Sequence, residues 1–408
     1  MSVDARIPDH LNLPALPAGW TYAPLDSVLA ERGLSYGIVQ PGQDDPTGIP
    51  VVRVASIRDG KIDDEEPLRV ASEIEARFER TRLHGGEVLL TLVGSVGQVA
   101  LVGEEHLGWN VARAVAVLRL RDSSQASWIK FCLESPLAQA YMHIWKTTTV
   151  QATLNLRDVR QLPIAIPPPL EQRAIAEVLE ALDEKIESNR RAQDCAERLA
   201  RAELTRAQQE EAESDVPIGR LVERVAEIIS PTALAESVVY VGLEHMPRGS
   251  MLLKEHGITD GLVSAKTVFR PRDVLFGKLR PYFKKVVVAP STGVCSTDIL
   301  VLRPILGDWA VATAVCASDD VIDYATAGSE GTRMPRVSWE YLARYEVPLP
   351  GPGGRQKLEA KIAPLLEFGM GLTVESDSLI ELRDVLLPKL VSGELRVRDA
   401  ERLVEDVV

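Results

Sequence analysis

The sequence has few of the residues that mark metal-binding and catalytic proteins. It contains four cysteines and six histidines among 408 residues, and aromatic residues make up only 5%. Cys132, Cys195, Cys295 and Cys316 form no Cys-x-x-Cys pair, and no two histidines have the spacing of a His-x-x-x-His or His-Glu-x-x-His motif. These absences argue against a zinc ribbon, a disulfide framework and a metal centre, and they fit a reducing cytoplasm.

Signals for nucleotide binding, membrane insertion and secretion are missing as well. The chain has no Gly-x-x-x-x-Gly-Lys-Ser/Thr phosphate loop and no apolar run long enough for a membrane span. Its first residues, MSVDARIPDHLNLP, carry acids and prolines where a signal peptide needs a basic end and an apolar core, so we expect a cytoplasmic protein. PPPL at 167–170 lacks the flanking residues of a methyltransferase loop and is read as a rigid end to a strand. We therefore predict no catalytic residue in this chain.

The charge balance is acidic and unevenly distributed. With 46 Lys and Arg against 59 Asp and Glu, the net charge is −13, which argues against indiscriminate binding to nucleic acid. Residues 170–215 hold seven basic and thirteen acidic residues, whereas residues 216–350 hold fifteen of each. Any contact with phosphates should therefore come from small local surfaces outside the acidic segment.

Three pairs of segments recur in the same order, about 185 residues apart, which indicates an internal duplication. VVRVASIRDGKI (51–62) corresponds to VVYVGLEHMPRGSM (238–251), and both read as a strand and a glycine-containing turn. The segments 85–102 and 270–289 both read as a bent hairpin, and 153–173 corresponds to 336–356. The sequence thus predicts two globular α/β bodies built on one plan.

A long helical pattern follows each copy. Residues 170–209 contain no Pro or Gly and are rich in strong helix formers, and apolar residues recur every seven positions in both patterns. Asn189 and Gln193 interrupt the first apolar seam, and Gly369, Gly371 and Pro388 weaken the second pattern locally. The predicted seam consists of Ile175, Leu179, Leu182, Ile186, Leu358, Ile362, Leu365, Leu372, Leu379 and Leu386.

The two helices are expected to pair with each other, because a single helix of this kind is unstable in water. About 40 residues would form a rod of roughly 60 Å. The alternative is that each helix is an ordinary amphipathic surface helix packed on its own domain.

Two segments carry the chemistry of a DNA-contact surface. FGKLRPYFKK (276–285) interleaves cations with planar rings, and KTTTVQATLN (146–155) is rich in groups that hydrogen-bond to bases or phosphates. AGSEGTRMPRVS (327–338) is the counterpart of the second segment, and a few cations flank the first strand and turn. The alternatives are a strand with solvated lysines and core aromatics, and loops that only connect elements. The candidate DNA-binding residues are Arg53, Arg58, Lys61, Lys146, Thr148, Gln151, Asn155, Lys278, Arg280, Tyr282, Lys284, Lys285, Arg333 and Arg336.

Two stretches carry a family resemblance. LPIAIPPPLEQRAIAEVLEALDEKIESNRR (162–191) and LLPKLVSGELRV (386–397) resemble the central and C-terminal helices of the specificity subunit of type I restriction–modification systems. TLNLRDVRQLPIAIPPPLEQ is similar to the exit from a target-recognition domain of that family. The second half departs from the pattern, because GPGGRQ (351–356) replaces the usual Pro-Leu-Glu-Gln-type entry to the helix.

The resemblance implies an α/β fold with two target-recognition domains separated by an antiparallel two-helix coiled-coil spacer. The domains would span 1–165 and 213–350, and the helices 166–212 and 351–408. It also implies that the chain itself binds no cofactor or metal and reads double-stranded DNA. Two modification subunits would bring S-adenosylmethionine, and two restriction subunits can add ATP and magnesium chemistry.

Other classes of protein remain as alternatives. The chain could be an acidic coiled-coil scaffold or a DNA mimic without DNA readout, as the acidic segment 170–215 would allow. The balanced charge of 216–350 argues against a mimic, which needs acid over its whole surface. A solitary methyltransferase should show a cofactor loop and an Asn/Asp-Pro-Pro-aromatic motif, and both are missing.

Overall fold

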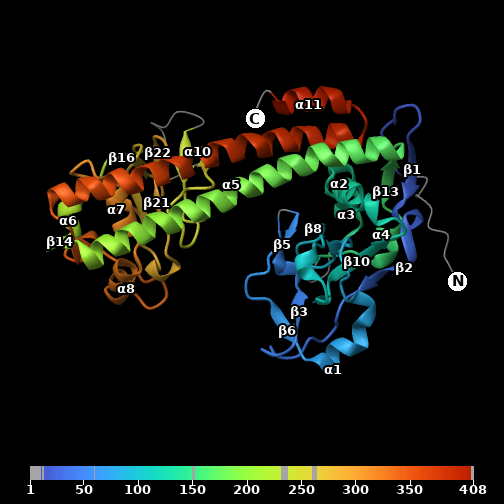
Figure 1. The fold of residues 1–408 in the computed structure, drawn as a ribbon, viewed down its shortest axis with the longest axis horizontal. Coiled ribbons are helices and arrows are strands. Elements are labelled where there is room, and N and C mark those ends of the chain that lie inside the picture. The colour runs from blue at the N-terminus through green and yellow to red at the C-terminus, as the bar shows by residue number, and fades with distance from the viewer. Residues whose placement is uncertain are drawn as a thin grey trace. The chain divides into compact units, whose positions relative to one another are not determined.

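The computed structural model describes residues 11, 13–58, 60–148, 152–230, 238–259 and 264–405. The chain forms two compact units, one of Met1–Glu184 with Leu379–Val408 and the other of Lys185–Ser378. The two longest helices, α5 (Pro169–Glu210) and α10 (Pro352–Val391), each contribute residues to both units (Figure 1). Each unit therefore combines an α/β body with one segment of each long helix.

The body of the first unit is built around a four-stranded antiparallel sheet in the order β2-β10-β7-β8. Its strands are β2 (Leu29–Tyr36), β10 (Val115–Leu120), β7 (Val88–Thr91) and β8 (Val99–Leu101). The sequence VLLT of β7 is buried at every position, as expected for a central strand covered on both faces. The helices of this body are α1 (Ser72–Glu75), α2 (Ala126–Glu134), α3 (Pro136–Trp145) and α4 (Leu156–Arg160).

Smaller sheets complete this body. β3 pairs parallel with β9 and antiparallel with β6, whereas β1 pairs with β13 and β4 with β5. Their bounds are β1 (Thr21–Pro24), β3 (Ile49–Val52), β4 (Ile57–Arg58), β5 (Lys61–Ile62), β6 (Leu68–Val70), β9 (Asn110–Val111), β11 (Thr147–Thr148), β12 (Ala152–Thr153) and β13 (Pro163–Ile166). The helix α11 (Val397–Glu405) follows α10 and also belongs to the first unit.

The body of the second unit repeats this arrangement. Its four-stranded sheet has the order β15-β23-β20-β21, and in the second sheet β17 pairs parallel with β22. The strands are β14 (Ser214–Pro217), β15 (Val222–Val225), β16 (Ile228–Ile229), β17 (Val239–Val241), β18 (Gly257–Ile258), β19 (Lys266–Phe269), β20 (Val274–Gly277), β21 (Val286–Val288), β22 (Gly293–Cys295), β23 (Ile299–Pro304) and β24 (Glu346–Leu349). The helices are α6 (Ile218–Leu221), α7 (Trp309–Cys316), α8 (Asp319–Ala327) and α9 (Trp339–Leu342).

A buried carboxylate occupies the same place in both bodies and confirms the duplication. Glu87 precedes β7 and accepts from the His84 N–H (2.9 Å), and Asp273 precedes β20 and accepts from the Arg270 N–H (2.8 Å). Each carboxylate also binds an arginine on the neighbouring strand, Arg119 or Arg303. A shared hydrogen-bonding motif of this detail, about 185 residues apart, follows from duplication far more simply than from chance.

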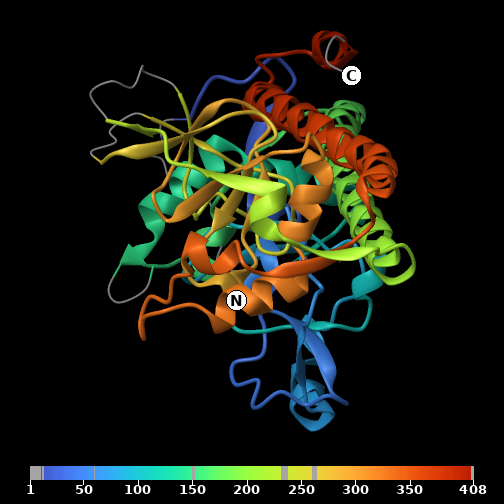
Figure 2. The same cartoon turned by 90° about the vertical axis from the view of Figure 1, so that its left-hand side faces the viewer.

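The two long helices lie side by side within each unit, as Figures 1 and 2 show. In the first unit, Arg383 of α10 binds Asp183 of α5 with its Nε 2.6 Å from Oδ1. In the second unit, Asn189 Nδ2 donates to Glu375 Oε2 (2.9 Å), and Gln193 Nε2 donates to the Gly369 carbonyl oxygen (3.0 Å). The α/β class and the antiparallel pairing of the two helical segments are thus confirmed.

The seam between the helices is apolar except at its middle. Leu365 is only half-buried, and the next residue, Leu366, is the buried one at this turn of α10. Asn189 and Gln193 are buried as well. The other predicted seam residues are buried: Ile175, Leu179, Leu182, Ile186, Leu358, Ile362, Leu372, Leu379 and Leu386. No helix among the described residues is long and apolar enough to cross a membrane.

Candidate nucleic-acid interface

In the second unit, the turn between β20 and β21 is held against the segment that precedes α9. The Arg280 N–H donates to the Pro335 carbonyl oxygen (2.8 Å), and the Val337 N–H donates to that of Lys278 (3.1 Å). The Arg280 guanidinium also donates to the Arg333 carbonyl oxygen (3.1 Å). We call residues 278–285 and 333–337 the basic turn. It brings together seven of the predicted DNA-binding residues: Lys278, Arg280, Tyr282, Lys284, Lys285, Arg333 and Arg336.

An aromatic pair lies within the basic turn. Tyr282 is 48% exposed, and its ring packs edge-on against Phe283 with 4.8 Å between centroids. The guanidinium of Arg248 lies over the Phe283 ring, 4.1 Å from its centroid. Arg248 was not among the sequence candidates, because nothing in its local sequence indicates that it meets a residue 35 positions later. Within FGKLRPYFKK, Phe276 is buried in β20, whereas Tyr282 is exposed and Phe283 is half-buried in the short 3-10 helix that follows.

Two cations of the basic turn are paired with carboxylates on the protein. Lys284 Nζ lies 2.7 Å from Asp319 Oδ1, and Arg336 Nε lies 2.9 Å from Asp298 Oδ1, an interaction that raises the pKa of Arg336. Lys285 instead turns inward and donates to the Leu243 carbonyl oxygen, and burial lowers its pKa. Three cations are exposed and present their charge to solvent: Lys284, Arg333 and Arg336. The ammonium group of Lys285 instead binds the protein backbone.

The corresponding turn of the first unit is uncharged. Gly94 N–H donates to the Ala152 carbonyl oxygen (3.0 Å), and Leu154 N–H donates to that of Leu92 (2.8 Å), which reproduces the pairing in the basic turn. Asn155 is exposed at the start of α4, and Lys146 Nζ lies 2.9 Å from His143 Nδ1. The backbone of Thr148 forms part of β11, and Gln151 lies outside the described residues.

The hairpin β4–β5 places the third group of candidates elsewhere in the first unit. It approaches the C-terminal end of α2, because a Cβ on Gly60 would lie 3.0 Å from Glu134 Oε1. Arg53 and Arg58 are exposed and Lys61 is half-buried. Both strands of the hairpin also contact β8, the strand that follows the Gly94 turn.

Buried polar contacts hold each body on its helix segments. In the first unit, Lys130 Nζ of α2 binds Asp183 Oδ2 (2.7 Å), and Arg383 binds Glu134 Oε2 (2.8 Å). Burial raises the pKa of Glu134 despite these two cations. In the second unit, the carboxylate of Glu197 on α5 accepts from the Met251 N–H (2.7 Å), and Arg201 donates to the Ala317 carbonyl oxygen (2.9 Å). The bodies are thus fixed to their helix segments by directional contacts.

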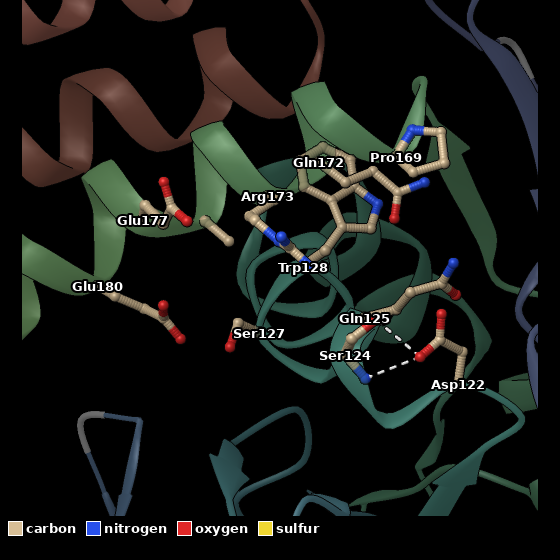
Figure 3. A pocket seen from close by; sticks show the side chains of 11 residues that line it. Asp122, Ser124, Gln125, Ser127, Trp128, Pro169, Gln172, Arg173, Glu177 and Glu180 are labelled. Carbon is tan, nitrogen blue, oxygen red and sulfur yellow. Dashed lines mark hydrogen bonds between the residues drawn. The ribbon is translucent and has the colours of Figure 1, made fainter.

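A pocket of about 310 Å³ lies between α5 and the start of α2 in the first unit (Figure 3). Arg173, Glu177 and Glu180 line one side of it, and Asp122 lies on the other and accepts from the Ser124 N–H (3.0 Å). Trp128 also lines the pocket, and its indole N–H donates to the Ala165 carbonyl oxygen (3.0 Å). The lining contains no histidine or cysteine, and its Ser124 hydroxyl donates to Asp122 Oδ1 (2.7 Å), a local contact two residues apart at the start of a 3-10 turn. The pocket therefore reads as a gap where α2 docks on α5.

Comparison with known proteins points to one family. Residues 41–197 match the model of the type I restriction modification DNA specificity domain. The EcoBI specificity subunit of Escherichia coli is 30% identical over 171 residues, which are 41% of this chain and 35% of that protein. The MjaIX specificity subunit of Methanocaldococcus jannaschii is 20% identical over 346 residues, 77% of this chain and 78% of that protein.

A solved structure shares the fold. The S subunit of a type I restriction–modification system from M. genitalium superposes with a TM-score of 0.57 at 16% identity, covering 91% of this chain and 96% of that one. The match with the E. coli relative, in contrast, spans only about a third of that protein's length. The domain match, the relatives and the fold all point to type I restriction–modification specificity subunits, which this chain resembles.

Proposed function

We propose that this chain is the non-catalytic DNA-recognition subunit of a type I restriction–modification complex. Each α/β body reads one half of a bipartite target in double-stranded DNA. The observation that carries the proposal is the duplication of one body with different chemistry on the equivalent turns. Gly94 and its neighbours form an uncharged turn, whereas the basic turn carries arginines, lysines and Tyr282. Because the two bodies differ at these positions, the target should be asymmetric rather than palindromic.

The chemistry would be supplied by partner subunits. Two modification subunits, bound along α5 and α10, would methylate adenine with S-adenosylmethionine, and restriction subunits would add ATP- and magnesium-dependent translocation and cleavage. The net charge of −13 supports separate roles for this chain and its partners, because neutralisation of phosphates dominates the affinity of proteins for DNA and an acidic chain neutralises few of them. The modification subunits would then provide most of the basic surface that surrounds the duplex.

An acidic scaffold without DNA readout is the alternative function. The basic turn argues against it, since a scaffold or DNA mimic has no use for exposed Arg333, Arg336 and Lys284 around an exposed tyrosine. A DNA mimic would instead present carboxylates at such a surface.

Mapping of methylated adenines by single-molecule sequencing tests the proposal. Cells with the chain and its modification partner should methylate one split, asymmetric motif, and cells without the gene for this chain should lose that mark at every site. An unchanged methylation pattern would contradict the proposal. Footprinting of the complex should show two protected segments around an unread spacer, and a single uninterrupted segment would argue against two separate reading bodies.

A further inference from the structure

Two residues of the basic turn have a backbone conformation that favours glycine. Arg280 has a φ of 49° and Lys284 a φ of 53°, and they flank the short 3-10 helix Pro281–Phe283. In this left-handed region the Cβ of an L-residue approaches its own carbonyl oxygen, so arginine and lysine are strained where glycine would not be. Such outliers concentrate at functional sites.

The first unit has glycine at both equivalent positions. Gly94, with a φ of 78°, makes the same backbone hydrogen bond as Arg280. The Thr91 N–H donates to the Gln98 carbonyl oxygen (2.9 Å) as Gly277 does to Lys285 (2.8 Å), so Gly97, with a φ of 93°, corresponds to Lys284. The same turn therefore exists in this chain with the residue that its backbone prefers, and the second unit departs from it at both positions with a cation.

Contacts within the protein do not account for these two cations. The ion pair of Lys284 with Asp319 is exposed on both sides, at 47% and 72%, and such pairs contribute little to stability. Within the part of the chain that the structure describes, the side chain of Arg280 donates one hydrogen bond, to the Arg333 carbonyl oxygen (3.1 Å) at the surface. Neither contact offsets the strain of the left-handed backbone. The folded chain alone therefore does not explain why cations occupy these two positions.

We propose that Arg280 and Lys284 bind two backbone phosphates of the duplex in the second half-site, one on each side of Tyr282. This inference rests on the proposed function and specifies how the second body contacts DNA. Lysine and arginine are the residues that bind phosphate, and such contacts fix the register of a protein on DNA without reading its sequence. The first body, with Gly94 and Gly97, makes no equivalent charged contact from this turn.

The test compares glycine variants of the two cations in the complex with the modification subunits. Arg280→Gly and Lys284→Gly should each weaken binding to a labelled duplex carrying the methylated motif by about ten-fold, the low end of a hydrogen bond to a charged group. Each should lower the slope of log affinity against log salt by about 0.9. The preferred bases should stay the same, and the melting temperature should stay unchanged or rise because glycine relieves the strain.

Arg272→Gly is the matched control. Arg272 also has a left-handed backbone (φ 68°), but it precedes β20 whereas the basic turn follows that strand, and it binds Glu367 (2.8 Å). This variant removes the same charge and should leave affinity and salt slope at their original values. Arg280→Lys, which keeps the charge, should retain most of the binding.

Three outcomes decide the inference. Unchanged affinity and salt slope in both glycine variants would overturn it. A loss of affinity together with a lower melting temperature would also overturn it, because the residues would then stabilise the fold rather than bind phosphate. An equal loss of affinity in Arg272→Gly would mean that only the net charge of the chain matters, and it would also overturn the inference. If the unaltered complex fails to bind the split motif specifically, the proposed function itself fails.

Discussion

Glu359 shows how one side chain can attach a body to a long helix. Its carboxylate, on α10, accepts from the N–H groups of Ala310 (3.1 Å) and Val311 (2.9 Å) in the first turn of α7. These N–H groups have no partner within their own helix, so the carboxylate replaces the missing acceptors. Burial raises the pKa of Glu359, because removal from water disfavours the charged form more than the two hydrogen bonds favour it.

This raised pKa predicts a specific dependence of stability on pH. The folded chain holds a proton on Glu359 more tightly than the unfolded chain, whose pKa is near 4.5, so the contribution of Glu359 falls as the pH rises through the interval above 4.5. Thermal melts of the original chain and of Glu359→Gln between about pH 4 and pH 7 should therefore diverge, the original losing stability relative to the variant. If the melting temperatures of the two proteins changed in parallel over that interval, the raised pKa of Glu359 would be contradicted.

Gly328 predicts a steric effect at the end of α8. Its φ is ordinary, but a Cβ there would lie 1.9 Å from Cε1 of Tyr341, whose ring stacks on Tyr324 with centroids 4.4 Å apart. Gly328→Ala should therefore separate the two rings and lower the free energy of unfolding by about 1–3 kcal/mol, a typical cost of overpacking. Denaturant unfolding would measure this. Gly353→Ala, at a position with open space, should change the stability much less.

Single side chains were only partly predictable. The heptad pattern indicated that Asn189 and Gln193 lie in the helix seam, because that depends on spacing along one helix alone. Their partners Glu375 and Gly369, which are 186 and 176 residues away, depend on the register of a second helix, and the sequence does not state that register. The contact of Arg248 with Phe283 was missed for the same reason.

At the scale of elements, the two long helices differ in how they tolerate unfavourable residues. α5 begins at Pro169 and ends at Glu210, close to the predicted 170–209, because its composition is uniform. α10 begins at Pro352, within the unusual GPGGRQ segment, and contains Pro364 and Pro388. Proline is well suited to a first helical turn, which explains the start. Packing against α5 and against both bodies keeps the rest of α10 helical, although the helix propensity of its residues alone would not.

The polar middle of the helix pair should determine its register. Asn189→Ala removes hydrogen bonds to Glu375 and to Ser376, leaves the buried Ser376 hydroxyl without this partner, and should lower the free energy of unfolding by about 1–3 kcal/mol. Ser188→Ala, an exposed neighbour on the same helix, is the control. Denaturant unfolding should separate the two variants. Equal stability of the two variants would mean that the apolar residues alone align the helices.

At the scale of the whole molecule, the duplication was predictable and the details of the interface were not. Three segment pairs in one order were enough to predict two bodies and two helices, because each body repeats its own turns, glycines and buried strands. The turn between Arg58 and Lys61 lies beside Glu134, a neighbour that no sequence pattern indicates, and the role of these two cations in DNA binding stays a prediction. Surface cations leave no periodic pattern in the sequence, so their placement follows only from the tertiary structure.

The two bodies should act independently in recognition. Exchange of residues 1–160 for the corresponding segment of one of the related specificity subunits should change one half of the methylated motif and leave the other half unchanged. Single-molecule sequencing of DNA from cells with the exchanged chain measures this. Altered preference in both halves would contradict independent reading.

The isolated chain should bind DNA weakly. Its net charge of −13 repels phosphates, and the basic turn is a small surface with two of its cations already paired. Electrophoretic mobility shifts of the purified chain near physiological salt should show no stable complex, whereas addition of the modification subunits should produce one. Tight and salt-sensitive binding by the chain alone would contradict this division of labour.

The charged contacts of α2 imply a compatibility rule for any chimaera joined after residue 160. Lys130 and Glu134 would come from the donor, whereas Asp183 and Arg383, which hold them, would stay with the recipient. A donor with apolar residues at those two places would leave Asp183 and Arg383, both half-buried, paired with each other but without their contacts to α2. Natural exchange of such domains between genes should therefore favour lineages that keep all four of these charged residues.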